Sequence, residues 1–148
     1  MTTTKGKTNR RERREHRENS QGVSADSARS VVELIGVVGP CAAGKSTLIA
    51  GLKRLGYDVR HIAQEHSYVP YMWRRLTNPD VLIFLDASYP ITCQRRNLDW
   101  SEADYAEQQR RLAHARESAD LYLPTDDLSI EEVLRCALEF VKGRQEKK

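Results

Sequence analysis

The chain has 148 residues, of which 39% are hydrophobic and 30% charged, and its formal net charge is +3 at pH 7. This length supports one domain with a modest hydrophobic core. We expect a cytoplasmic protein that neither spans a membrane nor is secreted, because there is no long apolar run, no hydrophobic signal core and no CxxC pair among the three cysteines.

Residues 1–30 form a polar stretch without apolar periodicity, a composition typical of a disordered arm. Eight Lys and Arg against four acidic residues give this stretch +4, which leaves −1 for the remainder of the +3 chain. The arginines of residues 10–17 could contact nucleic acid or another polyanion. The glutamates between them favour a solvated arm, so nucleic acid is kept as an alternative partner.

A match to the phosphate-binding pattern G-x-x-x-x-G-K-[ST] begins at Gly39 and ends at Ser46. The apolar residues 34–38 before it have the length of a buried strand, and residues 48–55 after it place Leu and Ile at helical spacing. Strand, loop and helix are the context in which this pattern binds phosphate. We therefore predict a nucleotide-binding loop followed by a helix that opens at Lys45.

The parts of this motif suit a triphosphate. Gly39 and Gly44 allow backbone angles that turn N–H groups towards an anion, and the next helix adds its positive end. Lys45 brings a full charge to the outer phosphates, and the Ser46 hydroxyl can hold Mg²⁺. We predict ATP and Mg²⁺ as ligands, with these nucleotide-binding residues: Gly39, Pro40, Cys41, Ala42, Ala43, Gly44, Lys45, Ser46 and Thr47.

Short apolar runs then alternate with helical patterns, which is typical of a parallel α/β sheet. Beside residues 34–38, strands are predicted at residues 57–63, 81–85 and 120–123. Helices are predicted at residues 45–55, 67–76, 88–97, 101–118 and 129–143. Gly56 should end the first helix, Ser101 should cap the fourth, and Ser129 with Glu132 should form a capping box. Gly143 should end the last helix before a polar tail at residues 144–148.

Three features together resemble the nucleoside- and nucleotide-kinase family of P-loop proteins. They are the glycine motif, the strand PDVLIFLDAS (residues 79–88) with an arginine-bearing helix after it, and the ending ADLYLPTDDLSIEEVL (residues 119–134). The likeness covers residues 33–141 and is closest to thymidylate, cytidylate, gluconate and shikimate kinases. It implies that residues 31–143 have a three-layer P-loop NTPase fold, with a short, mostly parallel sheet of about four strands flanked by helices.

In that family an arginine-bearing lid closes over the phosphates. By position, the lid would begin at Arg95 and Arg96 and end at Arg110, Arg111 and Arg116. The resemblance thus implies that Arg96 contacts the nucleotide and that Arg110 and Arg111 clamp the transferring phosphoryl group. The alternative is a solvated helix face on which Glu107 pairs with these arginines. The resemblance also places residues 124–126 beside adenine.

Phosphoryl transfer also needs a carboxylate near the outer phosphate, for Mg²⁺ or as a base. Asp86 follows a hydrophobic run, the pattern of a Walker B acid, whereas Glu65 falls where the resembled kinases carry an acidic-basic pair. We favour Glu65, as catalytic group with Lys45 and as Mg²⁺ ligand with Ser46. The alternatives are an exposed strand-end acid for Glu65 and a helix cap for Asp86. The four histidines lack metal-ligand spacing, so no other metal is predicted.

Residues 66–75 are the best candidate for binding a small-molecule acceptor. Tyr68, Tyr71 and Trp73 could stack on a planar ring, and Arg74 or Arg75 could hold an anionic group. Packing of the aromatic side chains against the sheet is the alternative. Compared with the resembled kinases, the segment between the second and third strands is short, so the acceptor region is reduced.

The most favoured function is therefore a small kinase that transfers the γ-phosphate of ATP to a nucleoside, nucleotide or other small metabolite. The reduced acceptor region supports an alternative, a nucleotide-binding module or slow ATPase that acts as a switch or partner subunit. A kinase that acts on nucleic-acid ends held by the N-terminal arm is a third hypothesis. The sequence argues against a GTPase, because no N/T-K-x-D or D-x-x-G motif follows the glycine motif.

Overall fold

The computed structural model describes residues 33–96 and 100–147, and the predicted N-terminal arm lies outside them. Four strands run in the order β1 (Leu34–Val38), β2 (Asp58–His61), β3 (Val81–Asp86) and β4 (Leu121–Pro124). The helices between and after them are α3 (Lys45–Arg54), the 3₁₀ turn η2 (Gln64–His66), α4 (Met72–Leu76), α5 (Tyr89–Arg96), α6 (Glu102–Ser118) and α7 (Ile130–Lys147).

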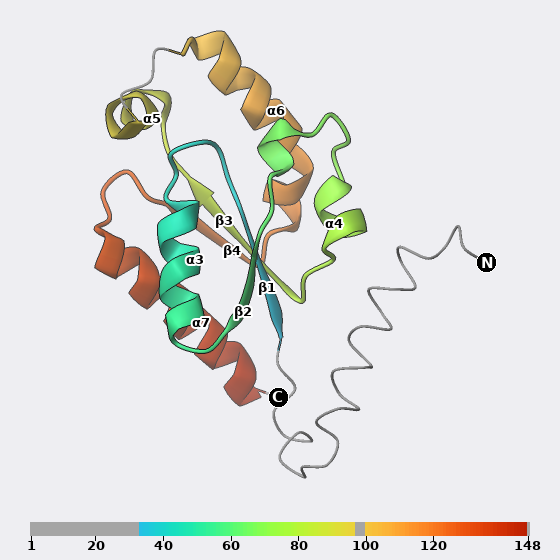
Figure 1. Ribbon diagram of the computed structural model, residues 1–148, viewed down its shortest axis with the longest axis vertical. Helices are drawn as coiled ribbons and strands as arrows, with labels where there is room; N and C mark the ends of the chain where they lie inside the picture. Colours follow the sequence, from blue (N-terminus) through green and yellow to red (C-terminus); the bar gives the residue numbers. More distant parts are fainter. Residues whose placement is uncertain (1–32, 97–99, 148) are drawn as a thin grey trace, which may run out of the picture. The chain divides into compact units, whose positions relative to one another are not determined.

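The four strands form one sheet in the order β2-β1-β3-β4, and all three neighbouring pairs are parallel (Figure 1). This confirms the prediction of an α/β chain with a four-stranded parallel sheet flanked by helices. Because β1 lies between β2 and β3, the chain leaves the carboxyl end of β1 where the strand order reverses. In open parallel sheets that point is where ligands bind.

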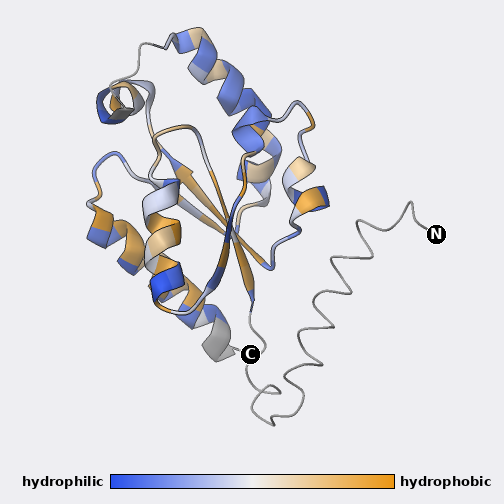
Figure 2. Cartoon of the chain, viewed as in Figure 1, coloured by the Kyte–Doolittle hydropathy of each residue, from blue (hydrophilic) through white to orange (hydrophobic). Residues whose placement is uncertain are grey.

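Alternate side chains of the strands face opposite layers of helices. Ile35 and Val37 belong to a core cluster with residues of α3 and α7, whereas Val38 and Phe84 cluster with Trp73 of α4 and with residues of α6. The sheet is therefore covered on both faces. Figure 2 shows the same pattern as hydrophobic colour on β1, β3 and the packed parts of α3 and α7. Among the described residues, no helix combines the length and apolar character needed to cross a membrane.

Several helix ends follow the local signals of the sequence. Gly56, at φ +95°, ends α3, where its N–H bonds to the carbonyl of Lys53 and the N–H of Tyr57 bonds to that of Leu52. Ser101 and Asp104 form a capping box on α6. The predicted capping box of Ser129 with Glu132 is also present, at 2.8 and 3.1 Å.

Several predicted boundaries are wrong. Helix α7 runs on through Gly143 to Lys147, because Gly143 is not among the glycines with positive φ that would end it. Residues 144–147 are therefore helical. Helix α4 begins at Met72 and not at residue 67, because Ser67 and Val69 bond to each other in a turn, with the Ser67 hydroxyl accepting from the Val69 N–H at 3.1 Å. Strand β2 is likewise shorter than predicted.

Candidate functional site

The backbone of the glycine loop (residues 39–46) is held in an unusual conformation directly after β1. Gly39, Ala42 and Gly44 have φ angles of +153°, +68° and +101°. At Gly39 a side chain would overlap the backbone carbonyl of Leu85, because the loop passes directly over the end of β3. Glycine is therefore required at residue 39 by packing and at residue 44 by its left-handed φ.

The loop leaves a group of main-chain donors free. The N–H groups of Gly44, Lys45, Ser46 and Thr47 bond to no acceptor in the described part of the chain. They lie at the positive end of α3, whose first turn contains no acidic side chain. The side chains of Ser46 and Thr47 are exposed at the same place. This arrangement can bind an anion with several oxygens.

Lys45 points back over the loop into a buried ion pair. Its ammonium donates to the carbonyls of Gly39 at 2.5 Å and Pro40 at 3.0 Å, and to Oε2 of Glu65 at 3.0 Å. The two side chains are only 6% and 3% exposed. Burial, and after it the charge of Lys45, lower the pKa of nearby His61 from its ordinary value. The structure thus places a full positive charge at the mouth of the loop, next to a carboxylate.

The second oxygen of Glu65 is buried without a hydrogen-bond partner in the described part of the chain. The turn η2 that carries Glu65 is fixed by the buried side chain of Gln64. Its amide donates to the carbonyls of Val69 at 2.8 Å and Arg111 at 3.2 Å, and accepts from the N–H of Trp73 at 2.8 Å. The Glu65 backbone is therefore held in place, while one oxygen of its carboxylate is buried without a partner among the described residues.

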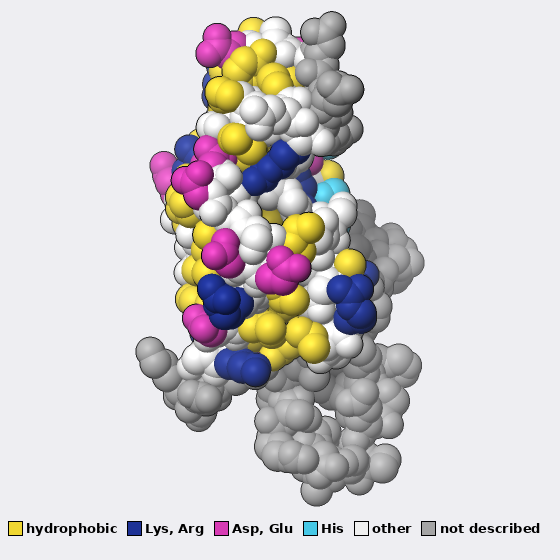
Figure 3. All heavy atoms as spheres, turned by 90° about the vertical axis from the view of Figure 1, so that its left-hand side faces the viewer, with side chains coloured by type: hydrophobic (Ala, Val, Ile, Leu, Met, Phe, Trp, Pro, Cys, Tyr) yellow, Lys and Arg dark blue, Asp and Glu magenta, His cyan; other side chains and the backbone are white. Residues whose placement is uncertain are grey.

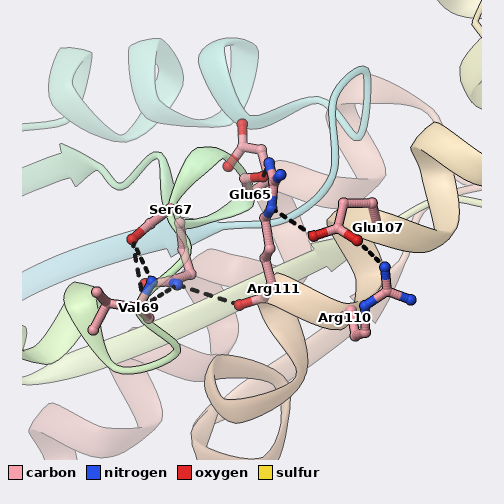
Figure 4. Close-up of polar contacts among 7 residues, drawn as sticks. Glu65, Ser67, Val69, Glu107, Arg110 and Arg111 are labelled. Atoms are coloured by element: carbon pink, nitrogen blue, oxygen red, sulfur yellow. Dashed lines mark hydrogen bonds and ion pairs between the residues drawn. The ribbon is translucent and has the colours of Figure 1, made fainter.

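Of the two arginines predicted to be catalytic, only Arg111 lies beside this carboxylate. Figure 4 shows Arg111 reaching from α6 to the backbone of Glu65, to which it donates at 3.2 Å, and to the side chain of Glu107. Its guanidinium also lies 4.3 Å from the ring centre of Tyr68. Arg110 is 70% exposed and pairs with Glu107, with no described contact to the loop.

The carboxylate of Asp86 belongs to a separate hydrogen-bond network. It accepts from the N–H of Ala87 at 2.9 Å, the amide of Gln109 at 3.2 Å, the hydroxyl of Tyr122 at 2.5 Å and the guanidinium of Arg116 at 3.4 Å. Both oxygens are thus engaged within the protein. This arrangement favours a structural role for Asp86 and leaves Glu65 as the carboxylate that is paired with Lys45.

The hydrogen bond from Tyr122 to Asp86 should be detectable as a raised pKa of the tyrosine hydroxyl. Partial burial and the bond to Asp86 raise the pKa of Tyr122 to about 12, so the hydroxyl should stay neutral as pH rises through the ordinary tyrosine range near 10. The difference between the ultraviolet absorbance titration curves of the wild type and of Tyr122→Phe should give the titration curve of Tyr122 alone. Asp86→Asn should move its midpoint down, because ionisation no longer places two negative charges together. A wild-type midpoint near 10 would contradict the described bond.

Arg95 and Thr125 brace the outer side of the loop. Arg95 donates to the carbonyl of Ala42 at 3.2 Å and to the hydroxyl and carbonyl of Thr125 at 2.9 and 2.6 Å. The Thr125 hydroxyl also contacts the carbonyl of Ala43 at 3.2 Å. Thr125, one of the residues predicted beside a nucleobase, therefore touches the glycine loop. The side chain of Arg96 lies outside the described part of the structure.

Among the aromatic side chains of residues 66–75, one is packed against the sheet and the others are exposed, so each of the two predicted alternatives holds for part of the segment. Trp73 packs in the core and donates its ring N–H to Nδ1 of His114 at 3.1 Å. Tyr68 is 82% exposed, and Tyr71 is also exposed. The exposed ring of Tyr68 lies against the guanidinium of Arg111 from α6, which itself contacts the backbone of Glu65.

Gln108 and Gln64 are site residues that the sequence reasoning missed. Gln108 of α6 accepts from the N–H of Cys41 at 3.0 Å and donates to its sulfur at 3.2 Å, which ties the loop to a helix far along the chain. An isolated Gln on an amphipathic helix carries no sequence signal for this role.

A comparison of the chain with protein-family models gave no match, and neither did a comparison with curated proteins. The geometry is therefore what characterises this site: free amides, a buried Lys45–Glu65 pair, and Arg111 beside it.

Proposed function

We propose that this chain is an ATP-dependent phosphotransferase with a P-loop NTPase fold, a small-molecule kinase that transfers the γ-phosphate of ATP. One observation carries the proposal: Lys45, at the start of α3, is paired at 3.0 Å with a carboxylate whose second, buried oxygen has no hydrogen-bond partner in the described part of the chain. A cation for phosphate oxygens and a carboxylate for Mg²⁺ or a proton thus stand side by side. Phosphoryl transfer requires these two groups near the outer phosphate.

The residues fit ATP and Mg²⁺. The free N–H groups of residues 44–47 and the ammonium of Lys45 would hold the phosphates, while the exposed hydroxyl of Ser46 and the open oxygen of Glu65 would hold Mg²⁺. When bound, Mg²⁺ neutralises charge on the phosphate oxygens. A phosphate would give Lys45 a new acceptor and so release Glu65 from the ion pair.

The acceptor would bind on the opposite side of Glu65, where Arg111 and Tyr68 lie. Arg111 is fixed by Glu107 at 3.0 Å and by the Glu65 carbonyl at 3.2 Å, so its guanidinium is preorganised at the edge of the site. An exposed tyrosine under a guanidinium suits a small, planar or anionic acceptor. Glu65 would then accept the proton of an attacking hydroxyl.

The experiment that tests this assignment compares Glu65→Gln with Asp86→Asn. We expect Glu65→Gln to lower kcat for ATP turnover by about 100-fold or more, because a positioned acid or base typically contributes 10²–10⁴-fold. Asp86→Asn should lower the free energy of unfolding, because it weakens bonds to Tyr122 and Arg116, yet retain turnover in the folded fraction. Turnover near wild type in Glu65→Gln, with its loss in folded Asp86→Asn, would reverse the assignment.

One observation favours a second function, a nucleotide-binding module or slow ATPase. Only η2 and the five-residue α4 lie between β2 and β3, and Trp73 of α4 is buried, so few residues remain to build an acceptor pocket. A panel of nucleosides, sugars and other metabolites separates the two. A kinase should release ADP faster with one acceptor, whereas a module should turn over slowly and equally with all.

The hypothesis of a nucleic-acid kinase stays a prediction about the N-terminal arm. On the face shown in Figure 3, which carries α3 and α7, basic and acidic side chains are interspersed with hydrophobic ones. Polynucleotide binding usually requires a clustered basic surface. Loss of oligonucleotide affinity on deletion of residues 1–30, with a steep salt dependence, would support it.

A further inference from the structure

We propose that Cys41, Glu65 and His66 form a second metal site, for a soft divalent cation of the Zn²⁺ class. One ligand atom from each, a sulfur, a carboxylate oxygen and an imidazole nitrogen, lies within 4.8 Å of the others. Thiolate, imidazole and carboxylate are the three ligand types that bind Zn²⁺ in proteins. The histidine spacing along the sequence does not reveal this cluster, because the loop after β1 and the turn after β2 meet only in the fold.

A second, independent observation concerns the same carboxylate. Oε1 of Glu65 is buried and has no hydrogen-bond partner in the described part of the chain, although the side chain is only 3% exposed. An unpartnered buried carboxylate oxygen costs free energy unless a cation or donor approaches it. A metal ion bound between Glu65, Cys41 and His66 would supply that partner.

One of the separations matches that of two ligands on a tetrahedral ion. Bond lengths of about 2.0–2.3 Å place two ligand atoms on such an ion roughly 3.3–3.8 Å apart. Nε2 of His66 already lies 3.6 Å from Oε2 of Glu65. Gln108 holds the sulfur of Cys41 at 3.2 Å, and His66, 60% exposed, is free to turn inward. A water molecule would complete four ligands.

The chemistry separates this site from that of nucleotide Mg²⁺. Mg²⁺ takes oxygen ligands in octahedral geometry, whereas a sulfur and an imidazole favour Zn²⁺ and its neighbours in the transition series. Glu65 belongs to both sets, so the two ions exclude each other. The ammonium of Lys45, 3.0 Å from the same carboxylate, opposes a dication and favours reversible binding. Metal binding at this site would therefore regulate ATP turnover. This part of the inference rests on the proposed function.

Titration of the full-length protein with Co²⁺, which reports ligation by its absorption, tests the metal site without nucleotide. We expect a thiolate-to-metal charge-transfer band that Zn²⁺ removes by competition. Cys41→Ser should abolish the band, and His66→Asn should weaken Co²⁺ binding by at least about tenfold. Cys93→Ser, which removes another half-buried cysteine on α5, is the matched control and should leave the band unchanged. No band in the wild type, or a band lost in Cys93→Ser but kept in Cys41→Ser, would overturn the site.

Regulation is tested separately, by ATP turnover at buffered free Zn²⁺. Zn²⁺ should inhibit the wild type reversibly, with activity restored by a chelator, because it occupies Glu65. His66→Asn should require at least about tenfold more Zn²⁺ than the wild type for half-maximal inhibition of its own turnover. Equal sensitivity of the two proteins would overturn the regulatory role. If ATP neither binds nor turns over, the proposed function fails while the Co²⁺ result still decides the metal site.

Discussion

Replacing Lys45 by methionine is expected to weaken ATP binding by about 10- to 150-fold, measured by isothermal titration calorimetry. The methionine keeps the length of the buried stem but removes the ammonium that would bond to phosphate. Hydrogen bonds to a charged group contribute about 1.5–3 kcal/mol, which corresponds to that range. Lys53→Met is the matched control, because Lys53 lies in the last turn of the same helix with its side chain exposed. An affinity within twofold of wild type would contradict the nucleotide site.

The same substitution should also lower the free energy of unfolding. Removing one partner of a buried ion pair typically costs about 3–5 kcal/mol, because the other charge is left uncompensated, and Glu65 would be that charge. Proton uptake by the carboxylate would reduce this cost. The double variant Lys45→Met, Glu65→Gln should therefore be more stable to urea than Lys45→Met alone, without recovering ATP affinity. Recovery of stability without binding would separate the structural role of Lys45 from its role in binding.

Gly39→Ala should lower the free energy of unfolding by at least about 3 kcal/mol and abolish nucleotide binding in the fraction that folds. The added methyl group would overlap the backbone carbonyl of Leu85, and backbone in the middle of a sheet cannot shift locally. To relieve the overlap, the loop must move away from β3, which displaces the amides at the start of α3. Urea denaturation measures the loss of stability.

Gly143→Ala is the matched control for this prediction. Gly143 lies inside α7, and a methyl group there would have no heavy atom within 4 Å. Alanine inside a helix is more favourable than glycine by about 0.5–1 kcal/mol, so this variant should be more stable than wild type. Equal destabilisation by the two substitutions would show that the close contact at Gly39 is not what requires glycine there.

Features that depend on neighbouring residues could be predicted from the sequence. The phosphate-binding pattern lies between a strand and a helix, Gly56 ends that helix, and two capping boxes begin α6 and α7. Each involves residues within about four positions of one another, so the backbone conformations that the side chains favour decide the outcome. The exception, Gly143, shows the limit of such signals, because a glycine can also continue a helix when nothing else stops it.

Which carboxylate faces the loop depended on contacts between distant segments. Parallel pairing of β1 with β2 brings Val37 beside His61, and so places Glu65 at Lys45, twenty positions away in the sequence. The same packing surrounds Asp86 with Tyr122 and Arg116, which come from β4 and α6. The sequence pattern alone left both acids open.

Local backbone preference and hydrophobic spacing were enough to predict a glycine loop that follows a buried strand and opens a helix. The surroundings of that loop depend instead on packing between distant segments, which supplies the carboxylate that pairs with Lys45, the glutamine 67 positions away that holds Cys41, and the histidine beside them. The physical reason is that parallel strands and their covering helices join distant segments, and no local preference encodes which side chains meet there.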